Sequence, residues 1–436
     1  MILLNQGKSW FLIYSNMKNI LDFLIEVGKL KKMPRTGFVW LGIKNPETIA
    51  QHSFRVAIMN WILGKKMKPK FNLKKIIQIS LVHDLCEIYA GDITPYWGLL
   101  PKDKKKRKEI LKRWIRFPQE IKAKRDQVKF IREKASLQKL VRVLPLKLEK
   151  EIMNCWLDYE RLISREGKFV KQGDKVETLL QALEYWGPKP DSPVIGWWEE
   201  VEDLVDHPIL LEFLEKLEKK FYQEKKVNGE LKFLLEIGKL KTMSRTGWIL
   251  RNVKNPETIA EHSFSLAMAS WVLSQRRILD LEKMLKMSLV YEICELLAGD
   301  VTPYDELLPS NKKKKILKRW PRFSRKEKAK IFLKDYRREK KALEKITSGL
   351  SPNLKKEIID LWDECKGRKT LEGKFVNQAY WLVTYLQALQ YFKENKKFPI
   401  LAWYEQMREF IEDSNLLELM GEMEDKYLPK RKIKFL

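Results

Sequence analysis

The chain has 436 residues, of which 44% are hydrophobic and 33% charged, with only 19 Gly and 18 Pro. Since one hydrophobic core rarely grows beyond ~250–300 residues, this length favours at least two domains, and the scarcity of turn formers argues against a many-stranded protein. The net charge of +28 favours anionic ligands, but lysine-rich helix faces in contact with solvent explain it more simply.

Residues 1–17 are mildly apolar but have neither a basic leading region nor a small-residue cleavage site. We therefore expect a short N-terminal extension and not a signal peptide. No apolar run approaches the ~20 residues that a membrane-spanning helix needs. The four cysteines show no CxxC pairing, which is typical of a reducing compartment. A cytoplasmic protein without membrane association is expected.

One long unit occurs twice in the chain. The segment FLIEVGKLKKMPRTGFVWLGIKNPETIAQHSF begins at Phe23 and returns, with substitutions, from Phe233. The offset between the copies is 210 residues here and falls to 208 and then 206 further along, so the second copy has small deletions. A period this long indicates a domain duplication and not a solenoid. The predicted domains are 18–225 and 226–436.

The apolar spacing within each unit is helical. Asn45, Pro46 and Glu47 are typical of a helix start, with an N-cap, a proline in the first turn and an acidic residue. A second helix is predicted over 76–90, ended by Gly91, and a third over 174–185. No segment alternates with period two. The sequence therefore predicts an all-α fold made of two tandem helical domains.

Histidines and carboxylates stand within these predicted helices of the first copy or, for Asp92, just past a helix end. They are His52, His83, Asp84, Glu87, Asp92 and Asp174. Imidazole nitrogens mixed with carboxylate oxygens suit a divalent transition metal, and buried acids need a cation as partner. Taken alone, a histidine on an apolar helix face is more often a hydrogen-bonded core residue than a ligand.

The second copy provides an internal control. Tyr291 and Glu292 replace His83 and Asp84, and Tyr380 replaces Asp174. The surrounding apolar pattern persists, as do Arg245, His262, Glu295 and Asp300. A purely structural role for the three replaced residues is therefore disfavoured, whereas His52 is left open because its counterpart is kept. We expect the second site to hold no metal.

Four separated segments carry a resemblance to a known family. PRTGF with Arg35, NPETIAQHS with His52, HDLCEIYAGDITP with His83 to Asp92, and KFVKQGDK with Asp174 together resemble the HD-domain 5′-deoxynucleotidases. The resemblance covers most of 18–225 and, in degenerate form, 228–436. It implies hydrolysis of deoxyribonucleoside 5′-monophosphates to nucleoside and phosphate.

The resemblance also implies roles for the residues. It implies one divalent ion held by His52, His83, Asp84 and Asp174, proton transfer by Glu87 and Asp92, and a phosphate clamp at Arg35. One of the two acids would activate water and the other protonate the leaving 5′ oxygen, and the sequence leaves their order open. This ligand set suits Mn²⁺, Co²⁺ or Fe²⁺ better than Mg²⁺.

Two positions depart from the family pattern. Gln51 stands where the family usually has the glutamate seen in Glu261-His262, and Thr36 stands at a substrate-binding position where some members carry an aromatic residue. These departures bear on the preferred substrate and not on the metal.

Other interpretations remain open at this stage. Because this family commonly forms homodimers, the second copy is expected to be a structural partner in an intramolecular pseudo-dimer; alternatively, it binds a nucleotide effector through Arg245 and Asp300. A nucleic-acid-binding protein with a vestigial HD fold is a rival, since LPKDKKKRKEILKRWIRF combines cations with Trp114 and Phe117. The same run also suits a helix with Ile110, Leu111 and Trp114 facing inward. An HD phosphodiesterase acting on a cyclic or oligomeric nucleotide is the alternative enzyme.

Overall fold

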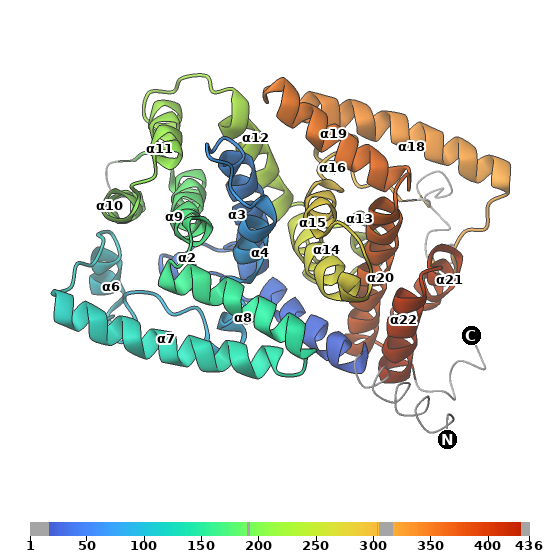
Figure 1. The fold of residues 1–436 in the computed structure, drawn as a ribbon, viewed down its shortest axis with the longest axis horizontal. Helices are drawn as coiled ribbons and strands as arrows, with labels where there is room; N and C mark the ends of the chain where they lie inside the picture. The colour runs from blue at the N-terminus through green and yellow to red at the C-terminus, as the bar shows by residue number, and fades with distance from the viewer. Residues whose placement is uncertain (1–16, 190–191, 303, 305–316, 429–436) are drawn as a thin grey trace. The chain divides into compact units, whose positions relative to one another are not determined.

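The computed structural model describes residues 17–189, 192–302, 304 and 317–428. Within these ranges the only regular elements are helices, accompanied by two isolated β-bridges, Pro34 with Thr48 and Ser244 with Thr258 (Figure 1). The predicted all-α fold is therefore confirmed. The predicted extension over 1–17 lies, except for Met17, outside the described residues.

The chain forms two compact units. The first contains Ile25–Leu235, and the second contains the described residues before Ile25 and those from Glu236 onward. Two helices cross these boundaries, the helix over 17–27 and its counterpart in the second repeat, α12. Each of these helices is therefore divided between the two units. Residues 17–24 group with the second unit, and 229–235 group with the first.

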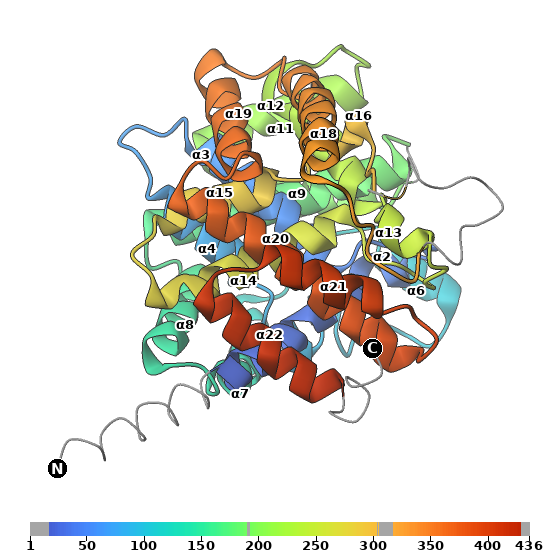
Figure 2. The same cartoon turned by 90° about the vertical axis from the view of Figure 1, so that its right-hand side faces the viewer.

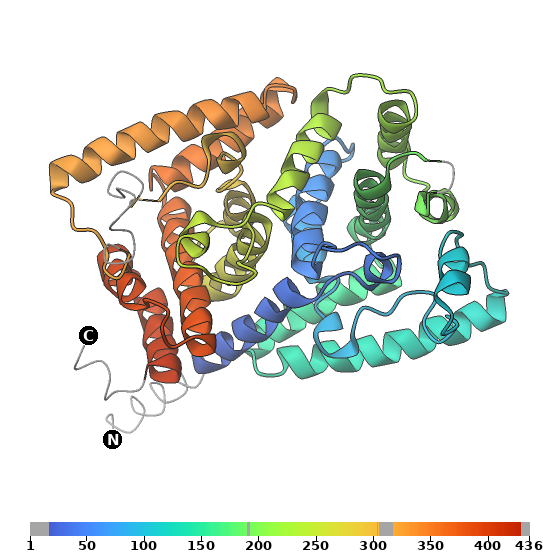
Figure 3. The same cartoon turned by 180° about the vertical axis from the view of Figure 1, so that it is seen from behind.

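The helices of the first repeat follow a helix over 17–27. They are η1 (Gly28–Lys32), α2 (Thr36–Trp40), α3 (Ile49–Gly64), α4 (Leu73–Val82), α5 (Glu87–Ala90), α6 (Lys104–Ile110), α7 (Gln119–Val141), α8 (Leu146–Arg161), α9 (Arg165–Trp186), α10 (Val194–Leu204) and α11 (Pro208–Phe221). Helices α3, α4 and α9 pack against one another at the centre of this unit, and Figure 3 shows it from behind.

The second repeat reproduces this series. Its elements are α12 (Gly229–Gly238), η2 (Lys239–Lys241), α13 (Thr246–Ile249), α14 (Ile259–Leu273), η3 (Ser274–Arg276), α15 (Leu281–Val290), α16 (Glu295–Ala298), α18 (Arg325–Ile346), α19 (Pro352–Lys366), α20 (Leu371–Glu394), α21 (Leu401–Phe410) and α22 (Ser414–Tyr427). Helices α14, α15 and α20 are the counterparts of α3, α4 and α9, and α21 and α22 pack on α20 (Figure 2).

Helix α3 is buried along its whole length and begins later than predicted. Its N-cap is Thr48, whose hydroxyl accepts from the backbone N–H of Gln51 while the Gln51 side chain accepts from the Thr48 N–H. The predicted start at Asn45 is wrong because this reciprocal capping box satisfies the exposed backbone groups three residues later. Glu47 is consequently a buried residue ahead of the helix and not a first-turn acid.

The helix predicted over 76–90 is interrupted. Helix α4 ends at Val82, and a tight turn precedes α5, with the Glu87 N–H donating to the Asp84 carbonyl and the Leu85 N–H to that of Val82. The single-helix prediction is therefore wrong, because apolar periodicity does not register a short turn with i+3 hydrogen bonds. Gly91 does end α5, with a positive φ of 78°.

Helix α9 begins at Arg165, capped by the Ser164 hydroxyl, so the predicted start at Asp174 is wrong and Asp174 lies inside the helix. Gly173, the preceding residue, permits a close approach: a Cβ there would overlap the Asn60 side-chain oxygen. In the second repeat the same two positions carry Ala379 and Ser270. The second repeat thus has a larger residue in place of Gly173 and a smaller residue in place of Asn60.

The basic run before α7 is only partly as predicted. Leu111 is buried, as expected, but Ile110 is 39% exposed, because α6 ends at Ile110 and the chain then turns.

Among the described helices, none combines the length and apolar character required to cross a membrane.

Candidate active site

Two imidazoles and two carboxylates converge inside the first unit. His52 comes from α3, His83 and Asp84 from the turn after α4, and Asp174 from α9. His52 Nε2 lies 3.0 Å from Asp174 Oδ1 and 3.9 Å from Asp84 Oδ2. His83 Nε2 lies 3.2 Å from Asp84 Oδ2 and 4.0 Å from Asp174 Oδ1. The structure thus brings together all four residues of the predicted ligand set.

The hydrogen bonds of the two rings determine which nitrogen is left to bind a cation. His83 Nδ1 lies 2.8 Å from the Ser80 carbonyl oxygen, which can only accept, so the proton is on Nδ1. His52 Nδ1 likewise lies 2.5 Å from a Glu177 carboxylate oxygen. Both Nε2 atoms therefore face the carboxylates, and in a neutral ring each carries the lone pair that can bind a cation.

Facing nitrogen and oxygen atoms need a positive charge between them, which either a proton on the imidazole or a bound cation supplies. His52 Nε2 and Asp174 Oδ1 face each other at 3.0 Å, and the buried His83 Nε2 forms no hydrogen bond within the described part of the chain. Ligand atoms about 2.1 Å from one octahedral ion lie roughly 3.0 to 4.2 Å apart, which matches the spacings of this cluster. The mixed nitrogen and oxygen donors therefore fit a divalent transition metal.

Helix α9 also carries an outer layer of partners that the sequence did not indicate. Glu177, which accepts from His52, also accepts from Arg55 Nε at 2.5 Å, and Arg55 donates further to Glu184 at 2.6 Å. Despite burial and the repulsion of Arg35, the Glu177 and Asp174 carboxylates raise the pKa of His52 to about 9. Such partners fix the orientation of a ligating imidazole.

Tyr159 and Lys175 hold the Asp174 carboxylate in place. The Tyr159 hydroxyl donates to Asp174 Oδ2 at 2.7 Å, and Lys175 Nζ lies 3.4 Å from the same oxygen. Although burial opposes ionisation, Lys175 and His52 hold the pKa of Asp174 well below its usual range. Asp174 is therefore an anion held in one orientation.

Arg35 and Thr36 approach the cluster from the start of α2. Arg35 donates from Nη1 to Asp84 and from Nη2 to the Thr178 hydroxyl, both at 3.1 Å. The Thr36 backbone N–H donates to Asp92 Oδ2 at 2.6 Å. Arg35 and Asp92 line the cavity beside the cluster, whereas Thr36 is not among the described residues that do so.

Glu87 is a buried acid on the wall of this cavity. Its Oε2 has no hydrogen-bond partner within the described residues. Burial, reinforced by the charges of Asp84 and Asp92, raises the pKa of Glu87 well above its ordinary value. Asp84 is the opposite case: burial opposes ionisation, but His83 and Arg35 lower the pKa of its carboxyl. The pKa values of these two acids are therefore shifted in opposite directions, a pattern typical of acid–base sites.

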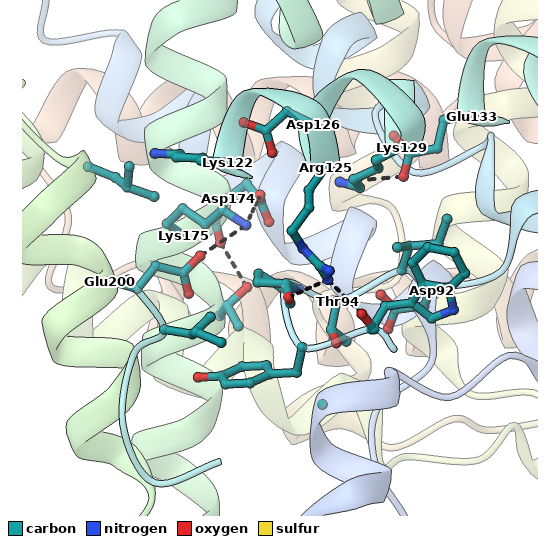
Figure 4. Close-up of a pocket in the computed structure, with 18 of the residues that line it drawn as sticks. Asp92, Thr94, Lys122, Arg125, Asp126, Lys129, Glu133, Asp174, Lys175 and Glu200 are labelled. Atoms are coloured by element: carbon teal, nitrogen blue, oxygen red, sulfur yellow. Dashed lines mark hydrogen bonds and ion pairs between the residues drawn. The ribbon is translucent and has the colours of Figure 1, made fainter. Parts of the chain in front are cut away.

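The cavity extends well beyond the metal-ligand cluster, with a volume of about 1170 Å³. Figure 4 shows its upper wall, where Lys122, Arg125, Lys129 and Glu133 project from α7. Its aromatic lining residues include Phe38, Tyr96, Trp97, Trp114, Phe117, Tyr159 and Trp197. The site therefore offers charged groups at one end and aromatic surfaces along its walls.

The corresponding place in the second unit is filled by a guanidinium. Arg245 is buried and donates to the Thr384 hydroxyl at 3.2 Å and to the Tyr380 hydroxyl. Its Nη1 also lies 2.8 Å from His262 Nδ1, so this nitrogen accepts and the ring proton is on Nε2. The His262 tautomer is therefore opposite to that of His52, and Nε2 presents a hydrogen where a ligand needs a lone pair.

The outer layer is lost from the second repeat together with the ligands. Val383 and Ser265 stand where the first repeat has Glu177 and Arg55, and Cys365 stands in place of Tyr159. A position-by-position comparison of the copies is the sequence signal that would have identified these residues. Without such a comparison, Glu177 and Glu184 have no adjacent motif that distinguishes them from the many other acids of the chain.

The fold and this cluster define an all-helical domain with a histidine–aspartate cluster that could hold a metal ion, and comparison with known proteins agrees. Residues 27–197 and 237–414 match the family of the HD domain. The chain belongs to the HD-domain family, with two copies of the domain.

Curated relatives narrow the class. The chain is 30% identical over 203 residues to 5′-deoxynucleotidase HDDC2 of Homo sapiens, covering 46% of this chain and 85% of that protein. It is 34% identical over 168 residues to 5′-deoxynucleotidase HDDC2 of Xenopus laevis, covering 38% and 70%. It is 30% identical over 198 residues to 5′-deoxynucleotidase hdd1 of Schizosaccharomyces pombe, covering 44% and 85%. The protein is an HD-domain phosphohydrolase related to the 5′-deoxynucleotidases.

Proposed function

We propose that the first unit hydrolyses deoxyribonucleoside 5′-monophosphates to nucleoside and phosphate. The observation that carries this proposal is the convergence of His52, His83, Asp84 and Asp174, with both Nε2 atoms facing the carboxylates, in the repeat that retains all four. The names of the similar proteins support the substrate class. We propose that the bound ion is Mn²⁺, Co²⁺ or Fe²⁺, because two of its ligands are imidazoles.

A divalent ion held by these four side chains would supply Lewis acidity to a phosphoryl oxygen and to a water molecule. Arg35 contributes a second positive charge and, with a planar fork of N–H donors, holds and orients the phosphate. Its present acceptors, Asp84 and Thr178, keep the guanidinium at the edge of the cluster.

Glu87 is assigned as the general acid that protonates the leaving 5′ oxygen. Its unpartnered Oε2 lines the cavity, and burial together with Asp84 and Asp92 raises the pKa of its carboxyl, which favours the protonated form that a general acid needs. Asp92, held by the Thr36 backbone N–H, remains an acceptor and orients the attacking water or the sugar. This division of roles follows from their different surroundings.

The test measures phosphate release from a panel of deoxyribonucleoside and ribonucleoside 5′-monophosphates with added Mn²⁺ or Co²⁺. Replacing His83→Ala or Asp174→Asn should abolish turnover. His262→Ala is the matched control, because this histidine occupies the equivalent position without a ligand-competent Nε2, and it should leave turnover within about twofold. A loss with His262→Ala as deep as with His83→Ala would contradict the assignment of catalysis to the first unit.

We further propose that the second unit is a structural, metal-free partner and not an effector site. Arg245 already donates to two hydroxyl groups and to His262, so it has little capacity left for a ligand phosphate. An intramolecular pseudo-dimer of the two domains predicts that the purified chain elutes as a monomer, and light scattering on the eluted peak tests this. Nucleotide binding that survives loss of the first unit's site would oppose this role.

A further inference from the structure

A cluster of three lysines lines the cavity on the side facing Asp174. Lys175 follows Asp174 on α9, and Lys129 projects from α7 (Figure 4). Lys171 lies one helical turn before Lys175 and also lines the cavity. The side chains of Lys175, Lys171 and Lys129 are 26%, 30% and 39% exposed, respectively. These ammonium groups are therefore ordered but still reachable from the cavity.

The cluster is in close contact with the metal-ligand residues. Lys175 Nζ lies 3.4 Å from Asp174 and 3.4 Å from Glu200. Lys171 Nζ lies 3.9 Å from the centre of the Tyr159 ring, and Tyr159 donates to Asp174. Lys129 is close enough to Lys175 for their charges to repel each other. One anion can therefore contact this cluster while another part of the same molecule lies at the metal-ligand site.

Each ammonium also keeps donors available. Lys171 is held by Glu160 at 2.7 Å and Lys129 by Glu133 at 3.4 Å, and Lys175 lies 3.4 Å from both Asp174 and Glu200. Since an ammonium has three N–H donors, one or two carboxylate contacts leave at least one donor for another acceptor. The acids thus position the lysines without saturating them.

A structural explanation for these ion pairs fits poorly with the second repeat. Asp335, Asn377 and Trp381 stand at the positions of Lys129, Lys171 and Lys175, and the partner acids Glu160 and Glu200 become Lys366 and Gln406. By contrast, a structural ion pair on neighbouring elements is kept in both repeats, as Arg113 with Glu199 and Arg319 with Glu405. The lysines have therefore changed together with the metal ligands and not with the helical framework.

The size of the cavity points the same way. A pocket that encloses one small molecule typically measures ~300–1,000 Å³, and this cavity measures about 1170 Å³. The cavity therefore has room for a ligand larger than a nucleoside monophosphate.

We propose that Lys129, Lys171 and Lys175 form a second phosphate-binding subsite, and that the preferred ligand is a nucleotide carrying a second phosphate group. The inference rests on the proposed function for the reaction but not for the binding. The second phosphate can belong to a 3′,5′-bisphosphate, to a 5′-diphosphate or to the next nucleotide of a short strand. These sources share one chemistry and are separated by the choice of probe.

The primary test is calorimetric binding to the metal-free full chain, in which no turnover interferes. The probes are deoxyadenosine 5′-monophosphate, its 3′,5′-bisphosphate, its 5′-diphosphate and the 5′-phosphorylated dinucleotide. At least one two-phosphate probe should bind tenfold or more tightly than the monophosphate. Lys171→Asn, which installs the residue type found in the second repeat, and Lys129→Gln should each reduce that ratio severalfold while changing monophosphate binding by less than twofold.

Lys366→Gln is the matched control, because it removes a half-buried lysine paired with an acid, Glu339, in the other unit. It should leave the ratio unchanged, and melting curves verify that every variant is folded. Equal affinity for all four probes, or an equal loss for all of them in both lysine variants, would overturn the subsite. If instead the preference is found but the metal-loaded enzyme hydrolyses no nucleotide, the proposed reaction fails and the subsite stands.

Discussion

Glu177 offers the sharpest test of how the chain prepares its metal ligands. This buried carboxylate accepts from His52 Nδ1 through one oxygen and from Arg55 Nε through the other, both at 2.5 Å. Glu177→Gln keeps the size and one carbonyl acceptor but removes the negative charge. The imidazole then becomes a weaker base, and its Nε2 a weaker ligand.

The expected effect is a 10- to 100-fold increase in the dissociation constant for Mn²⁺, since outer partners of ligating histidines typically contribute this much. This range corresponds to roughly 1.4–2.8 kcal/mol. Titration of the metal-free protein with Mn²⁺, followed by electron paramagnetic resonance of the free ion, measures the constant directly. Phosphate release should recover largely when Mn²⁺ is raised in proportion.

Glu184→Gln separates this effect from a general loss of packing. Glu184 is the other carboxylate on Arg55, at 2.6 Å, and is not among the groups bonded to His52. Both variants should lower the melting temperature by a few degrees, but only Glu177→Gln should weaken metal binding. Unchanged Mn²⁺ affinity in Glu177→Gln, or an equal loss in Glu184→Gln, would refute the reasoning.

Three further predictions concern stability. Arg245→Met removes the guanidinium that bonds to Thr384, Tyr380 and His262. It should destabilise the chain by about 1–3 kcal/mol, seen as a lower urea midpoint with metal content unchanged. An unaltered midpoint would contradict the structural role. Burial, partly offset by Arg245, raises the pKa of Glu292 from 4.5 to about 7. Between these two pH values the folded chain binds a proton that the unfolded chain has lost. The resulting contribution to stability is therefore lost as the pH rises from about 4.5 to about 7. Glu292→Gln, which resembles the neutral form, should therefore raise the melting temperature at pH 8 and alter it little at pH 5; the reverse dependence would show the sign to be wrong. Gly173→Ala forces a methyl group against Asn60 and should lower the free energy of unfolding by about 1–3 kcal/mol. Adding Asn60→Ser, which reproduces the pair found in the second repeat, should restore most of this stability. Additive losses in the double variant would rule out the close contact.

The sequence was sufficient for the class of fold and for the two histidines and two aspartates that the structure brings together. Helical periodicity repeats in both copies, and the histidine–aspartate residues stand out because the second copy keeps the apolar pattern without them. Local signals were less reliable at element boundaries. At Thr48 a capping box displaced the predicted start at Asn45, and the turn after Val82 interrupted a continuous apolar pattern.

Only the tertiary structure revealed the groups that act on the ligands from a distance. Glu177 lies 125 positions from His52 and 122 from Arg55, so no spacing rule connects them until α3 and α9 pack together. The Arg245 guanidinium is a similar case. Arg35 occupies the equivalent position in the first repeat but donates to Asp84 and Thr178, whereas Arg245 donates to His262.

The grouping of the first helices was also beyond the sequence. The helix over 17–27 and α12 have similar sequences, MKNILDFLIEV and VNGELKFLLEI, so neither has a stronger local preference for one unit. The sequence by itself determined that helices form, that the unit is duplicated, and that one copy keeps the full set of candidate metal ligands. Long-range packing decided which helix completes each unit and which side chains complete each site, because contact energies between distant segments are set by the fold and not by neighbours along the chain.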